Sequence, residues 1–288
     1  MRSLFSLSRR PWLFSFLALF FWFLCNLLVI ITLAWILQLE DQTQIQAPWP
    51  TLLANLLMVF IVAPFVLGFP GKGHTYREYL SEIRLTKMRP LLGFILLGLS
   101  CYLILALSQA AGVLVYRLLE GLPVDGSFIR RSFVLANDLP PRSNSWLISL
   151  PSIPEEAVWR GVVLAAFLRL YDQRKSIIFS ALVFGALHIF AVLGRPPTWA
   201  VGNVVWAAIF GLFYGYVTLK TDSLLPAMIV HYLGNLFVGT ITAYIQANGS
   251  VQQVVVYGIV SRWGIIPTIL MILWTRVFTT HWPSIQKL

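Results

Sequence analysis

Long apolar stretches alternate with short polar ones along the whole chain. Eight apolar segments have the length of helical spans, with approximate limits 12–38, 51–69, 90–116, 145–168, 176–193, 198–219, 224–245 and 252–275. A lipid bilayer core needs about 20 apolar residues per helix. The pattern therefore predicts an all-α, polytopic membrane protein with about eight transmembrane helices. No internal repeat or soluble domain is evident, so residues 1–288 are expected to form a single integral-membrane domain.

Composition agrees with this class, because 58% of the residues are hydrophobic and 11% are charged, against roughly a quarter charged in soluble proteins. The first apolar run follows a basic segment, as in a signal peptide. It is about twice as long as a signal-peptide core, and no small-residue cleavage site closes it. We therefore expect a retained anchor helix. Cys25 and Cys101 lie within apolar runs without metal-ligand spacing and are expected to be buried.

The net charge of +10 is better explained by topology than by a nucleic-acid partner. Most Lys and Arg residues fall in cytoplasmic segments if both termini are cytoplasmic, as the positive-inside rule favours. The long third loop, with Arg130 and Arg131, is the exception. We expect a multi-pass protein of the cell membrane, in contact with the lipid bilayer. In the second loop, an apolar stripe at helical spacing predicts a helix that either lies on the leaflet or packs on the protein; it comprises Tyr76, Tyr79, Leu80 and Ile83.

Ionisable residues inside membrane spans are expensive and point to function. Residues 149–168 read SLPSIPEEAVWRGVVLAAFL. Ser152 and Glu155 have the spacing of a capping box, which predicts a helix that begins at Ser152 after a broken or re-entrant piece. At about 100° per residue, Glu156 and Arg160 share a helix face, whereas Glu155 lies about 140° from Arg160. This spacing predicts a structural Glu156–Arg160 pair and an unpaired, chemically active Glu155.

Two histidines add to this set. Phe184 precedes His188 by four residues, and Asn235 follows His231 by four, so the members of each pair share a helix face. Glu155, His188 and His231 are all predicted near the membrane midplane. Each residue alone has an equally good structural interpretation, as a hydrogen-bonded packing residue or a buried ion pair. Together they favour a site that activates water.

These motifs resemble those of the CPBP family, the CAAX protease and bacteriocin-processing, or Abi-type, intramembrane endopeptidases. The matching residues are E-E-x-x-x-R (Glu155, Glu156, Arg160), F-x-x-x-H (Phe184, His188) and H-x-x-x-N (His231, Asn235), with a Thr-x-Ser-Leu turn at 221–224. The resemblance covers residues 145–240, which would form the catalytic core. It implies eight helices and peptide hydrolysis by a glutamate-activated water.

Carried over residue by residue, the resemblance implies that Glu155 is the general base and that His188 assists it. His231 and Asn235 would stabilise the oxyanion, while Glu156, Arg160 and Phe184 would support the site. A metal-dependent mechanism is permitted by the residue types. We expect no metal or other cofactor, because Asn is a poor zinc ligand and H-E-x-x-H is absent.

The implied substrates are membrane-associated proteins or peptides, such as prenylated CAAX proteins, leaders or pheromones. The alternative function is a non-catalytic immunity or sensor-regulating membrane protein on the same scaffold. A transporter is a weaker third interpretation, because no substrate-binding repeat is visible.

Overall fold

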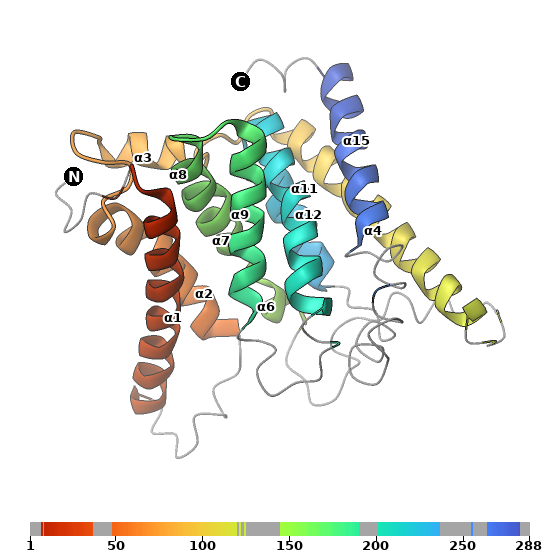
Figure 1. Ribbon diagram of the computed structural model, residues 1–288, viewed down its shortest axis with the longest axis horizontal. Coiled ribbons are helices and arrows are strands. Elements are labelled where there is room, and N and C mark those ends of the chain that lie inside the picture. Colours follow the sequence, from red (N-terminus) through yellow and green to blue (C-terminus); the bar gives the residue numbers. More distant parts are fainter. Residues whose placement is uncertain are drawn as a thin grey trace.

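The computed structural model describes residues 7, 9–36, 48–119, 121, 124, 145–189, 198, 201–236, 255 and 264–282. Within these residues, all the regular elements are helical (Figure 1). They are α1 (Pro11–Ile36), α2 (Pro48–Leu57), η2 (Met58–Val66), α3 (Tyr76–Glu82), α4 (Leu91–Leu119), α6 (Ser145–Ser149), α7 (Ser152–Glu156), η4 (Ala157–Val163), α8 (Leu164–Leu168), α9 (Gln173–Leu187), η6 (Val201–Val205), α11 (Trp206–Thr221), α12 (Leu225–Leu236) and α15 (Ile265–His281). The elements marked η are π-helical, and η2, η4 and η6 are continuous with α helices.

Each of the eight predicted segments contains a described helix, and the eighth is described at residue 255 and from 264 onward. Among the described residues, four helical runs are long and apolar enough to cross a membrane: Pro11–Ile36, Pro48–Val66, Leu91–Leu119 and Asn203–Thr221. Ile265–His281 is apolar but shorter. An all-helical fold with several candidate spans is thus confirmed, and eight crossings remain a prediction.

The long helix α1 shows the surface expected beside lipid. It lies at one edge of the helix bundle (Figure 1). Large apolar side chains project outward along it, including Phe16 at 65% and Trp35 at 80% exposure. A soluble protein rarely displays so continuous an apolar surface. The predicted burial of Cys25 on α1 and Cys101 on α4 is confirmed, and both thiols are free.

Small residues bring α9 and α11 into close contact. A Cβ added to Gly185 would lie 2.7 Å from the Cβ of Ala208, and one added to Gly211 would lie 3.2 Å from the Cβ of Ala181. Glycine at these positions lets the backbones approach, as in other packed membrane helices. This close approach places the end of α9 and the middle of α11 beside η4.

The predicted second-loop helix is α3, and it packs on the protein. Tyr79 and Ile83 are fully buried, and the Tyr79 hydroxyl donates a 2.5 Å hydrogen bond to the Val59 carbonyl. A capping box starts the helix: the Thr75 hydroxyl accepts from the Glu78 amide, and the Glu78 carboxylate accepts from the Thr75 amide. Of the two alternatives for this stripe, the structure supports packing on the protein.

Candidate active site

A buried carboxylate lies at the centre of the candidate site. Glu156, at the end of α7, has no exposed surface. Its Oε1 is 2.7 Å from Nδ1 of His231 on α12, and its Oε2 is 3.3 Å from Nε of Arg160. The Arg160 contact is an ion pair without hydrogen-bond alignment. The predicted Glu156–Arg160 pair is therefore present. The bond to His231 was not predicted, because no helical period relates residues 75 positions apart.

Aromatic rings enclose the guanidinium of Arg160, which is completely buried. Its Cζ lies 3.8 Å from the centre of the Phe184 ring and 4.9 Å from that of Tyr214. Such cation–π contacts stabilise a desolvated cation. A Cβ at Gly211 would lie 3.2 Å from Nη2 of Arg160, so α11 fits tightly over this group. Sequence reasoning missed Tyr214, which belongs to an apolar helix and to none of the motifs.

His188 lies at the end of α9. The sequence placed it well inside a span over 176–193, but α9 ends at Leu187 and His188 is its C-cap. Its Nδ1 is 2.9 Å from the Phe184 carbonyl, which is part of the unpaired last turn of the helix. A carbonyl only accepts, so Nδ1 carries the proton. In neutral His188, Nε2 is then left as an acceptor.

His231 is held through the same ring nitrogen by a different partner. Its Nδ1–H donates to the Glu156 carboxylate, and its ring stacks on Tyr214 with 5.0 Å between the ring centres. Each histidine therefore uses Nδ1 to hold a fixed acceptor, which is a carboxylate for His231 and a backbone carbonyl for His188. In both rings Nε2 is the nitrogen left for a ligand.

The two histidine rings lie against the same aromatic side chain. The ring centre of Phe184 is 4.9 Å from that of His188 and 6.1 Å from that of His231. Glu155 is partly buried on α7, next to Glu156 in the chain. Asn235 is partly exposed and lies one helical turn after His231 on α12. The structure therefore brings both histidines together at Phe184, while for Glu155 and Asn235 it gives the position on the helix.

The start of α7 differs from the prediction. Ser152 does not cap the helix: its hydroxyl donates to the Ser149 carbonyl at 2.6 Å, and Pro151 occupies the N-cap without a side-chain bond. The reason is that α6 leads into α7 through a single tight turn, so the Ser149 carbonyl is within reach. Buried Asn55 on α2 donates to the Pro151 carbonyl at 3.5 Å, which links this break to the N-terminal half of the chain.

The segment after Glu156 is π-helical. η4 begins at Ala157 and carries Arg160, so each turn contains more residues than the α-helical period assumes. The predicted angle between Glu155 and Arg160 therefore does not apply unchanged. Single π-helical turns often occur at functional sites.

An apolar cavity of about 300 Å³ adjoins the helix that carries both glutamates. Its walls include Ile153 and Pro154 of α7, Ala157 of η4 and Met228, which lies three residues before His231. Leu56 and Phe60 close it from α2 and η2. Such a cavity fits an apolar side chain or lipid group next to the polar cluster.

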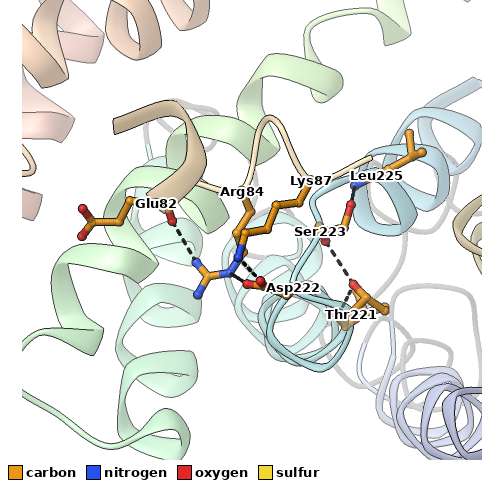
Figure 2. Close-up of polar contacts among 8 residues, drawn as sticks. Glu82, Arg84, Lys87, Thr221, Asp222, Ser223 and Leu225 are labelled. Carbon is orange, nitrogen blue, oxygen red and sulfur yellow. Dashed lines mark hydrogen bonds and ion pairs between the residues drawn. The ribbon is translucent and has the colours of Figure 1, made fainter. Parts of the chain in front are cut away.

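A charged contact fixes the helix that carries His231. Asp222, in the left-handed conformation with φ 52°, ends α11 just before α12. Its carboxylate pairs with Arg84 at 2.9 Å and with Lys87, both from the segment after α3 (Figure 2). The Thr221 hydroxyl contacts the Ser223 carbonyl across the same turn. The turn suggested by the Thr-x-Ser-Leu resemblance is therefore present, and it is anchored from outside the motif region.

Among the residues that the structure describes, no three His, Cys, Asp or Glu side chains are grouped so as to hold a metal ion.

Comparison with known protein families gives a match for the region that carries the site. Residues 145–237 match the family model of the type II CAAX prenyl endopeptidase Rce1-like domain. A search of curated proteins and a search of solved structures each found no match. The matched region begins at α6 and ends just after α12, so it contains all seven residues of the sequence motifs.

Proposed function

From the membership of this chain in the CAAX protease family, carried by residues 145–237, we propose that it is an intramembrane endopeptidase that uses a glutamate-activated water. Its substrates are membrane-associated proteins or peptides, of the CAAX type or of the leader and pheromone type. The observation that carries the proposal is the buried Glu156 carboxylate, adjacent to Glu155 in the chain, which contacts both His231 and Arg160, while the rings of His188 and His231 both contact Phe184.

In the proposed mechanism, Glu155 takes a proton from a water molecule, which attacks the scissile carbonyl carbon. His188, neutral and with its Nε2 lone pair available, accepts a hydrogen bond from the other O–H of the same water and orients it. The carbonyl oxygen gains negative charge and receives hydrogen bonds from His231 and Asn235. The carboxylate of Glu156 stabilises the positive charge of His231 as this happens. The proton held by Glu155 then passes to the leaving amine, and the peptide bond breaks.

The surrounding structure supports a substrate that enters from the bilayer. The apolar cavity beside α7 offers no polar side chain to a ligand, so an apolar segment of a membrane-associated substrate fits it. Both glutamates of the cluster lie on the same helix, within a chain that has several candidate membrane spans. We propose that the cavity receives the apolar part of the substrate and that the cluster cleaves beside it.

The test is Glu155→Gln, which keeps size and hydrogen-bonding capacity but removes the base. Loss of a general base should lower the cleavage rate about 10²–10⁴-fold, measured with purified protein on a substrate found by comparing the membrane peptides of wild-type and variant cells. Glu82→Gln, at a surface ion pair, is the matched control and should cleave normally. Normal cleavage by Glu155→Gln would exclude Glu155 as the base.

A second arm separates the mechanism from its alternatives. Cleavage should persist after EDTA treatment, and loss that added Zn²⁺ restores would favour a metal-dependent reaction. The double variant Glu155→Ala/His188→Ala should fail to complement a deletion strain. Full complementation would support the non-catalytic immunity or regulatory function.

A further inference from the structure

A second cavity, of about 590 Å³, opens at the opposite end of α8 from the candidate active site. Its walls come from three separate parts of the chain: the residues just before α1, the loop after η2 and the end of α8. Cationic side chains dominate them, with Arg9, Lys72 and Arg169 joined by His74. None of the described residues that line the cavity is acidic, so it is suited to an anion.

Arg169 forms a fixed wall of this cavity. Its guanidinium donates to the Glu82 carboxylate at 2.7 and 3.0 Å and to the Pro70 carbonyl. Its Cζ also lies 4.7 Å from the centre of the Phe69 ring. These contacts lock the loop after η2 against α8. The positive charge of Arg169 is thereby largely balanced by Glu82.

Arg9 and Lys72 carry the uncompensated charge. Both side chains are exposed, and within the described part of the chain neither forms an ion pair. Gly71 and Gly73 flank Lys72 with φ of 118° and 89°, a conformation that other residues rarely adopt. The loop backbone therefore takes a path that brings Lys72 to the same cavity as Arg9.

The location of the cavity indicates the source of the anion. Arg9 lies two residues before the candidate span Pro11–Ile36, and Pro70 lies four residues after the candidate span Pro48–Val66. Nearby, the Trp12 indole donates to the Tyr171 hydroxyl at 3.2 Å. Aromatic residues of this kind gather where membrane helices meet the headgroups. The cavity thus adjoins the ends of two candidate spans, where the headgroups of a surrounding bilayer are expected.

We propose that this cavity binds a phosphate group, held by Arg9 and Lys72, and that an anionic phospholipid headgroup supplies it. Basic pockets between membrane helices bind such headgroups elsewhere. The site lies apart from the catalytic cluster and does not depend on proteolysis. Its occupant would join the start of α1 to the end of α8, and so join the N-terminal half of the chain to the matched domain.

The experiment is native mass spectrometry of purified protein, with phosphatidylglycerol and phosphatidylcholine of the same acyl chains. Wild-type protein should retain phosphatidylglycerol selectively. Arg9→Gln and Lys72→Gln should each weaken retention of phosphatidylglycerol on the order of fivefold, as about 1 kcal/mol per basic residue implies. Lys72→Arg keeps the positive charge and should retain the lipid as the wild-type protein does. Arg77→Gln is the control, because Arg77 is exposed on neighbouring α3 but does not line the cavity.

Competition identifies the source of the phosphate. If neither glycerol 3-phosphate nor inorganic phosphate displaces the lipid, the site recognises a lipid headgroup. If either compound displaces the lipid, the site binds a soluble phosphate. Both results support the phosphate site, provided that the Arg9 and Lys72 variants weaken binding and melt like wild type. Equal retention by these variants and by Arg77→Gln would overturn the proposal.

Discussion

The buried ion pair at the centre of the candidate site gives the sharpest prediction. Glu156 and Arg160 both have 0% side-chain exposure, so each charge depends on the other. Glu156→Gln would keep a carbonyl oxygen for Nδ1–H of His231 but would remove the negative charge. Arg160 would then be left charged and surrounded by Phe184 and Tyr214. We expect the folded state to lose stability for this reason.

The size of the effect follows from burial. Removing one partner of a buried ion pair costs about 3–5 kcal/mol, because the remaining charge is desolvated and uncompensated. At roughly 2–4 °C per kcal/mol for a chain of a few hundred residues, the melting temperature should fall by roughly 6–20 °C. Tryptophan fluorescence in detergent is a suitable assay, since the chain contains 11 tryptophans.

Glu82→Gln is the matched control, with the same substitution and again an arginine partner. Glu82 and Arg169 are 2.7 Å apart, but their side chains are 29% and 25% exposed. Water can therefore solvate the remaining charge, and the loss should stay below about 1 kcal/mol. Equal losses in Glu156→Gln and Glu82→Gln would refute the argument from burial.

A double variant tests the cause. If an uncompensated Arg160 destabilises Glu156→Gln, then adding Arg160→Met should recover part of the lost stability, because apolar side chains can replace a buried ion pair at little cost. The two substitutions would then be strongly non-additive, as expected for residues in contact. A further fall in melting temperature on adding Arg160→Met would contradict this explanation.

Three further predictions concern other parts of the fold. Gly185→Ala should lower the free energy of unfolding by about 1–3 kcal/mol through overpacking, because the new methyl group would lie 2.7 Å from the Cβ of Ala208. Thermal unfolding measures this loss. Asp222→Asn should lower stability by about 1 kcal/mol and increase proteolysis of the segment after α3. The backbone and side-chain hydrogen bonds with Thr75 lower the pKa of Glu78 from its ordinary value of 4.5. The stability that Glu78 contributes is thus complete above pH 4.5 and lost as pH falls through the lowered pKa, visible as faster amide exchange in α3.

Each of these predictions has a control. Leu182→Ala, at a 54% exposed position on α9, should change stability far less than Gly185→Ala, and a larger loss would argue against tight packing there. Asp172→Asn alters an exposed 3.5 Å pair with Lys175 and should have a smaller effect than Asp222→Asn. Glu78→Gln does not titrate, so acid-dependent exchange that persists in this variant would exclude Glu78 as its cause.

Features that depend on the local spacing of residues were predicted correctly from the sequence. The apolar segments correspond to helices, and the i,i+4 relation correctly placed Glu156 beside Arg160. Prediction from the sequence failed where the local geometry departs from the α-helical period. The π-helical η4 and the early end of α9 at Leu187 are examples, because an unpaired last carbonyl and a wider turn leave no mark on apolar periodicity.

Contacts between segments that are distant in the chain could also not be predicted from the sequence. Tyr214 stacks on His231, and Asn55 reaches the Pro151 carbonyl, yet neither residue belongs to a motif. Ser152 had the spacing of a cap, but Pro151 occupies the N-cap and the Ser152 hydroxyl donates to the Ser149 carbonyl. In each case the partner is set by how helices pack, which a single sequence does not specify.

The two histidines show how packing divides chemistry between identical side chains. Both rings use Nδ1 to hold a fixed acceptor, so Nε2 is the nitrogen left for a substrate or water. The two acceptors differ in charge. The Phe184 carbonyl that holds His188 carries no net charge, whereas the Glu156 carboxylate that holds His231 is an acid. Under the proposed mechanism a neutral ring suits the water and a cationic ring suits the oxyanion. Exchanging these roles would require a carboxylate beside His188 at the end of α9 in place of the Glu156 carboxylate beside His231, so under this mechanism the position of Glu156 decides which histidine stabilises the oxyanion.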